Sequence, residues 1–175
     1  MEDTALLIEK AKNGDKDAYG ILYKDYYGRI YRYCKVNLYR EDIAEDVCQE
    51  VFIRAWKALH TFFLKDGGTF QAFLFRIARN LIIDLSRKKK EFSLETYQEI
   101  AVEEDFEEKL DKKDAIEKVK YALSKLSDAD RQLILLRYFE ELNHADVAKI
   151  LGVKEGNVRV KTMRILQQLK NILKK

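Results

Sequence analysis

The chain has 175 residues, 47% of them hydrophobic and 36% charged, which excludes wholesale disorder and leaves room for one ordinary domain or two small ones. It contains no proline and only seven glycines, so few residues interrupt long helices. The net charge of +3 is unevenly spread, because residues 91–111 hold nine carboxylates against one lysine, whereas residues 76–90 and 154–175 are strongly basic. Two basic blocks around an acidic one suggest two surfaces that face nucleic acid, although either block alone could be a solvated helix face.

The cysteines and histidines give no sign of a metal centre. Cys34 and Cys48 lie in apolar stretches with helical spacing, which favours buried, reduced thiols over a disulfide framework. The two histidines lie far apart, so neither a metal site nor a cofactor is expected. The chain has neither an N-terminal secretion signal nor an apolar run of about 18 residues, and we therefore expect a cytoplasmic protein with no membrane span.

The first block, residues 1–90, has the apolar periodicity of four helices. Gly14 is expected to end the first of them, and the fourth has the clearest pattern, with apolar residues every three or four positions from Phe70 to Leu85. Four such faces can share one core, which predicts a helical bundle. The expected helices lie at about residues 4–13, 16–38, 41–59 and 69–89.

The connection between the third and fourth helices, residues 60–68, combines aromatic and basic side chains. Phe62, Phe63 and Lys65 precede a turn signal at residues 66–68. Aromatic rings beside basic helices can stack on unpaired bases. The same rings could equally be tucked under the bundle, so both interpretations of this loop stay open.

The second half of the chain begins with an acidic segment. Residues 91–112 lack a sustained apolar face and are predicted to form an acidic linker that self-repulsion keeps extended. Helical periodicity returns from about residue 113, and Ser127 is expected to cap a helix that runs to Phe139. The sequence therefore predicts an all-α fold of two small helical domains, residues 1–90 and 113–175, joined by this linker.

A helix-turn-helix is predicted at residues 144–163. Asn143 can cap a first helix, Gly152 can end it with a positive φ, and a second helix runs from about residue 155 to 173. A small residue at Ala148 lets the two helices approach, and Val158 can plug the second helix into the core. An ordinary pair of antiparallel helices would show part of this pattern, but the basic second helix favours DNA binding.

In a DNA-binding interpretation, the start of the second helix enters the major groove. Glu155, Asn157, Arg159 and Lys161 are then the candidates to contact base edges. Arg164, further along the helix, is better placed for phosphates, which supply affinity without sequence information.

Three segments carry a resemblance to a known family. Residues 42–56 read DIAEDVCQEVFIRAW, residues 70–84 read FQAFLFRIARNLIID, and residues 126–168 include the stretches LLRY and EGNVR. Together, and in this order, they resemble bacterial RNA polymerase sigma factors of the extracytoplasmic-function (ECF) group of the sigma-70 family. The resemblance covers nearly the whole chain and implies sigma domain two at residues 1–90 and sigma domain four at residues 113–175.

The resemblance implies a transcription initiation factor rather than an enzyme. Such a protein binds core RNA polymerase, through the β′ coiled-coil and the β flap, and directs it to promoter DNA. It also implies a cognate anti-sigma factor, which could hold the protein at the membrane. By position in the motifs, the polymerase-binding residues are Asp46, Gln49, Glu50 and Phe52; the residues for the −10 element are Phe63, Lys65, Arg76, Arg79 and Asn80; and those for the −35 element are Glu155, Asn157, Arg159, Val160, Lys161 and Arg164.

The chain departs from the family pattern at a few positions. Val160 stands where a small polar residue is usual, Asn157 where threonine is frequent and Phe73 where tryptophan is common. The −35 sequence that this chain prefers is therefore expected to differ from familiar ones. Two other classes of protein remain as alternatives: a stand-alone helix-turn-helix regulator, and a helical adaptor that binds only proteins.

Overall fold

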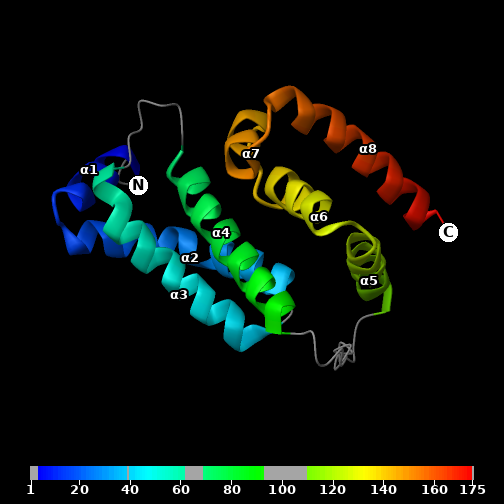
Figure 1. The fold of residues 1–175 in the computed structure, drawn as a ribbon, viewed down its shortest axis with the longest axis horizontal. Coiled ribbons are helices and arrows are strands. Elements are labelled where there is room, and N and C mark those ends of the chain that lie inside the picture. The colour runs from blue at the N-terminus through cyan, green and yellow to red at the C-terminus, as the bar shows by residue number, and fades with distance from the viewer. Residues whose placement is uncertain (1–3, 39, 62–68, 93–109, 175) are drawn as a thin grey trace. The chain divides into compact units, whose positions relative to one another are not determined.

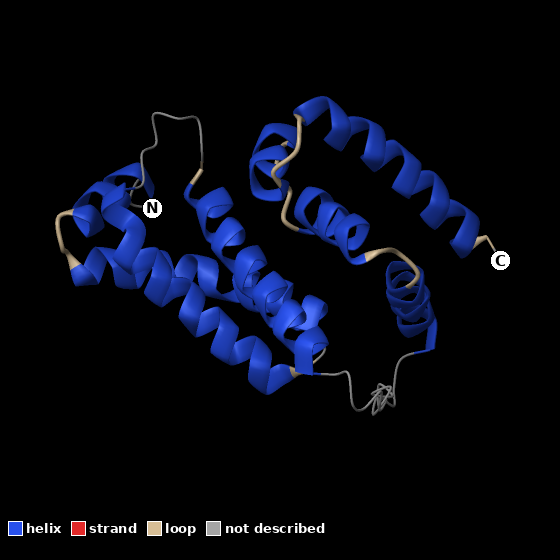
Figure 2. Ribbon diagram, in the orientation of Figure 1, coloured by secondary structure: helices blue, strands red, loops and turns tan. Residues whose placement is uncertain are grey.

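The computed structural model describes residues 4–38, 40–61, 69–92 and 110–174. Throughout these segments the regular structure is helical and no strand occurs, as predicted (Figures 1 and 2). The chain divides into two compact units, Met1–Gln98 and Glu99–Lys175. The greater part of the expected linker lies outside the described residues.

The first unit contains the four helices that periodicity predicts: α1 (Thr4–Lys12), α2 (Lys16–Leu38), α3 (Glu41–Ala58), which continues into a 3-10 turn at Leu59–Thr61, and α4 (Phe70–Phe92). Local chemistry sets their ends. Gly14 follows α1 with a φ of 91°. The Asp15 carboxylate then caps α2 by accepting hydrogen bonds from the amides of Asp17 and Ala18, each at 3.0 Å.

α4 differs from its predicted form at both ends and at Leu85. The helix runs on to Phe92, three residues beyond its predicted end and into the segment expected to be linker. Thr69 caps its start, where the hydroxyl oxygen accepts a hydrogen bond from the Ala72 amide at 3.1 Å. Leu85, expected in the core, is 36% exposed, so the apolar periodicity continues past the part of α4 that its neighbours cover.

The core of the first unit lies between α2, α3 and α4. Ala44, Cys48 and Ala55 are fully buried, and such small side chains let α3 approach its neighbours closely. Aromatic rings fill the remaining space, for example Tyr33 and Phe75, whose ring centroids lie 5.2 Å apart in an edge-to-face arrangement. Cys34 and Cys48 are free and buried, as predicted, and burial raises the pKa of both thiols to about 12.

The second unit contains α5 (Leu110–Ser124), α6 (Asp128–Ile134), a π-helical turn at Leu135–Phe139, α7 (His144–Leu151) and α8 (Glu155–Leu173). The predicted cap is confirmed, because the Ser127 hydroxyl accepts a hydrogen bond from the Asp130 amide at 3.2 Å. The single α-helix expected to run to Phe139 instead changes to a π-helix over its last five residues, Leu135–Phe139. The core of the second unit is apolar and includes Leu133, Leu136, Val147 and Val158. Among the described helices, none combines the length and apolar character needed to cross a membrane.

Candidate functional site

The turn between α7 and α8 has the geometry predicted for a helix-turn-helix. Asn143 caps α7, since its side-chain oxygen accepts a hydrogen bond from the Asp146 amide at 2.8 Å. Gly152 ends the helix in the left-handed region, with φ 67° and ψ 36°, and the Val153 amide bonds back to the Ala148 carbonyl oxygen at 3.0 Å. Ala148 and Val158 are both buried where the two helices meet. The local prediction for this motif is confirmed.

α8 presents a polar and basic face to solvent. Its buried side is formed by Val158, Thr162 and Ile165. All six residues that the sequence assigned to the −35 element are exposed: Glu155, Asn157, Arg159, Val160, Lys161 and Arg164. Two of them are paired, because a guanidinium nitrogen of Arg159 lies 2.7 Å from a carboxylate oxygen of Glu155.

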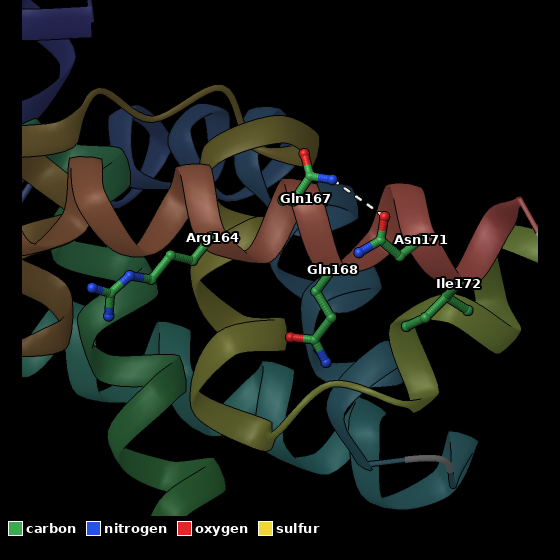
Figure 3. Close-up of a pocket in the computed structure, with 5 residues that line it drawn as sticks. All are labelled: Arg164, Gln167, Gln168, Asn171 and Ile172. Carbon is green, nitrogen blue, oxygen red and sulfur yellow. Dashed lines mark hydrogen bonds between the residues drawn. The ribbon is translucent and has the colours of Figure 1, made fainter.

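Further along α8, a shallow depression is lined by Arg164, Gln167, Gln168, Asn171 and Ile172. Figure 3 shows the Arg164 and Gln168 side chains extending from one side of the helix and that of Gln167 from the other. The side-chain amide of Gln167 donates a hydrogen bond to the Asn171 side-chain oxygen at 3.2 Å. These amides offer both donors and acceptors, which suits contacts to the sugars and phosphates of a nucleic acid.

Two arginines, Arg137 and Arg159, lie near His144 at the start of α7. Desolvation lowers the pKa of His144, and the nearby charges of Arg137 and Arg159 lower it further, against a smaller opposing effect of Glu155. Arg137 is also held in place, since its guanidinium donates a hydrogen bond to the Leu142 carbonyl oxygen. Arg137 and Arg159 thus place positive charge near His144, and Glu155 partly offsets it.

The residues predicted to bind polymerase occupy one side of α3, with one exception. Asp46 and Gln49 are exposed, and Glu50 is half-buried and pairs with Arg54 at 2.6 Å. Phe52 is only 3% exposed, with its ring 4.7 Å from that of Tyr23. Rings from α2 cover most of the Phe52 side chain, and the polymerase contact predicted for it stays a prediction.

An aromatic groove lies beside the residues predicted to bind polymerase, and the sequence did not predict it. Tyr19 and Trp56 form part of its wall, with ring centroids 4.8 Å apart, and Ile53 is 48% exposed beside them. Tyrosines at every fourth position of α2, from Tyr19 to Tyr31, are the signal that could have revealed it. The groove is lined by Lys16, Tyr19, Tyr23, Gln49, Phe52, Ile53, Trp56 and Lys57.

α4 carries the described part of the set predicted for the −10 element. Arg76 and Asn80 are exposed one turn apart, and Arg79 is half-buried between them. The other side of the helix enters the core through Leu74 and Ala78. Phe63 and Lys65, the two loop residues predicted for the same element, lie outside the described residues.

The fold is that of a two-unit, helical protein with a helix-turn-helix, and comparison with known proteins specifies its family. The model of Sigma-70 region 2 matches residues 22–92, and that of Sigma-70, region 4 matches residues 116–169. The chain is 31% identical to the ECF RNA polymerase sigma factor SigW of Bacillus subtilis, over 95% of both chains. It is 30% identical to the ECF RNA polymerase sigma factor BldN of Streptomyces coelicolor, over 95% of this chain but only 64% of the relative.

A solved structure supports the fold. The sigma factor RpoE, crystallised with the anti-sigma factor NepR from Bartonella quintana, superposes with a TM-score of 0.72 at 24% identity, covering 89% of this chain and 96% of the other. The chain belongs to the ECF group of sigma-70 family sigma factors. It is thus a factor that directs core RNA polymerase to promoters, and a stand-alone regulator is not favoured.

Proposed function

We propose that this sigma factor holds a promoter through two surfaces on separate units, α4 in the first and α8 in the second. Residues 1–90 would bind core polymerase and open the −10 element, residues 113–175 would read the −35 element as duplex, and residues 91–112 would link them. The observation that carries the proposal is the exposed, basic face of α8, whose opposite side is fixed in the core by Val158 and Ile165. The polymerase supplies the catalysis, and this chain supplies the choice of start site.

For polymerase binding, we assign the exposed side of α3 to the β′ coiled-coil. Asp46 and Gln49 are available for direct contacts. The Glu50–Arg54 ion pair is partly exposed, so replacing it by a contact to polymerase would cost little free energy. The aromatic groove beside Gln49 adds apolar area next to these polar groups, an arrangement typical of protein interfaces. We assign the β flap to the second unit from the family resemblance alone.

For the −10 element, the assignment rests on the exposed strip of α4. Asn80 can donate and accept hydrogen bonds at a base edge, while Arg76 and Arg79 can attract the strand's phosphates. Extruding a base costs a few kcal/mol, which stacking and edge contacts must return. That pocket would include Phe63 and Lys65, which stay predictions.

For the −35 element, the start of α8 would lie in the major groove. Lys161 and Arg164 have no ion pair with a described carboxylate, so they are available to phosphates or bases without losing one. Arg159 must leave Glu155 to reach DNA, but an exposed pair of this kind contributes little stability, so the exchange costs little. Glu155 would then be free to accept a hydrogen bond from a cytosine amino group.

We also propose an anti-sigma factor as a partner, because the structural neighbour RpoE was solved with one, NepR. Since its proposed partners are polymerase and promoter DNA, we place the activity in the bacterial cytoplasm. An anti-sigma factor anchored in the membrane would hold the protein there without a span of its own.

Run-off transcription with purified core polymerase on a promoter library tests the proposed function. We expect transcripts from a subset of promoters that share an upstream and a downstream element, and none from core polymerase alone. Tight, selective binding of the free chain to duplex DNA, with no effect on transcription, would instead indicate a stand-alone regulator.

A further inference from the structure

Val160 occupies a singular position on α8. The helix is fixed in its unit by Val158 and Thr162, both buried. Val160 lies two residues from each of them along the chain. Because each residue turns the helix by about 100°, Val160 lies on the opposite side of the helix axis from the midpoint between Val158 and Thr162. Of all side chains on the helix's first three turns, it therefore projects most directly away from the body of the unit.

Apart from Met163, Val160 is the large apolar residue exposed on the first three turns of α8. Its side chain is 51% exposed, and its neighbours one turn before and after, Asn157 and Arg164, are exposed hydrogen-bonding residues. A β-branched residue does not favour the helix over a straight-chain one. Its exposure leaves it little part in the core. The position therefore offers a compact apolar group, without donor or acceptor, at the centre of the face assigned to DNA.

The major groove offers one apolar group to meet such a side chain. Apart from the small C5–H of cytosine, the other features of the base edges there are hydrogen-bond donors or acceptors, whereas thymine carries a C5-methyl group. A valine facing a donor or acceptor would remove it from water without replacing its hydrogen bond, at a cost in free energy. We propose that Val160 contacts the C5-methyl group of a thymine in the −35 duplex and is the residue that requires thymine at that position.

The inference rests on the proposed function, in which α8 enters the major groove. It adds the chemical group that Val160 would recognise there, the C5-methyl group of thymine. Met163 provides the matched control. Met163 is also apolar, lies one turn further along α8 and is 74% exposed. Its direction differs from that of Val160 by about 60° around the helix axis, so it projects less directly away from the unit.

The test replaces each thymine of the −35 element by deoxyuridine, which lacks only the methyl group. The probe is a promoter duplex selected from a randomised library by the holoenzyme assembled from this chain and core polymerase. At one thymine we expect the substitution to weaken holoenzyme binding about fourfold, the value of one buried methyl-sized group. Val160→Ala should bring that thymine-to-uracil ratio close to one, whereas Met163→Ala should leave it at about fourfold.

Two results would overturn the inference while leaving the proposed function intact. One is equal binding of all uracil-substituted promoters by a holoenzyme that still selects a −35 sequence. The other is a thymine preference that Met163→Ala abolishes and Val160→Ala preserves. If the holoenzyme selects no upstream duplex element at all, the proposed role of α8 fails and the inference falls with it.

Discussion

The Tyr19 hydroxyl donates a hydrogen bond to the backbone carbonyl oxygen of Phe52 at 2.6 Å, which ties α2 to α3 beneath the aromatic groove. Burial raises the pKa of Tyr19, so the hydroxyl remains a donor throughout the physiological range. The contact joins α3, which carries the residues proposed to bind polymerase, to α2. The stability of the first unit and the shape of its proposed docking surface therefore depend on the same bond.

Tyr19→Phe removes this hydrogen bond and leaves the Phe52 carbonyl without that donor. We expect the first unit to lose about 1 kcal/mol of unfolding free energy. Urea unfolding followed by the fluorescence of Trp56, the single tryptophan of the chain, measures the loss directly. Tyr23→Phe, at an exposed tyrosine of the same helix, is the control and should change stability little. Equal stability of Tyr19→Phe and the parent protein would show that the bond contributes nothing.

Asp46→Ala combined with Gln49→Ala should weaken binding to core polymerase by at least about tenfold, because both side chains are exposed on the proposed docking side of α3. The helical content and the urea midpoint should stay unchanged, since neither side chain enters the core. Competition between labelled parent and variant proteins for core polymerase gives the measurement. Asp25→Ala, which removes an exposed carboxylate from α2, is the matched control for charge. Parental affinity in the double variant would remove α3 from the interface.

Glu141→Gly should stabilise the second unit by about 1 kcal/mol. Glu141 has a φ of 54°, a left-handed conformation that costs a residue with a Cβ atom about 1–2 kcal/mol and costs glycine nothing. Part of the gain is offset because glycine adds entropy to the unfolded chain. Thermal unfolding followed by circular dichroism measures the change, and Glu141→Ala should show no comparable gain. A lower midpoint for the glycine variant would refute the strain.

The buried thiols make stability depend on alkaline pH. The pKa of Cys34 and of Cys48 is about 12 in the folded protein and about 9 in the unfolded chain. Between these values the unfolded state has released protons that the folded state keeps, so stability is full below pH 9 and falls as the pH rises towards 12. At pH 8 iodoacetamide should alkylate the native thiols far more slowly than the urea-unfolded ones. Rapid labelling of both native cysteines would contradict their burial.

Much of this fold follows from local sequence signals. Ser127, Asn143 and Gly152 act as caps at their predicted positions, because capping depends on one side chain and the adjoining turn. Phe52 shows the limit. Its spacing on α3 is the same whether a partner or the chain's own tyrosines cover it, and only the packing of α2 decides between them.

Other features could not be predicted because they depend on tertiary packing. The π-helical turn at Leu135–Phe139 has apolar periodicity that an ordinary helix would share. Glu141 adopts a left-handed backbone without the glycine that usually signals it. Among the described residues predicted for DNA contacts, all have the exposure or half-exposure such contacts need, but exposure alone does not identify which base each one meets.

The most direct test of the two-surface account is permanganate footprinting of open complexes, combined with a holoenzyme binding assay, for Asn80→Ala and Arg164→Ala. Asn80→Ala should leave initial promoter binding near the parental level and sharply reduce thymine reactivity at the −10 element. Arg164→Ala should weaken initial binding about tenfold, with normal melting once the holoenzyme is saturating. Normal melting with Asn80→Ala, or the same defect in both variants, would contradict the division of promoter recognition between α4 and α8.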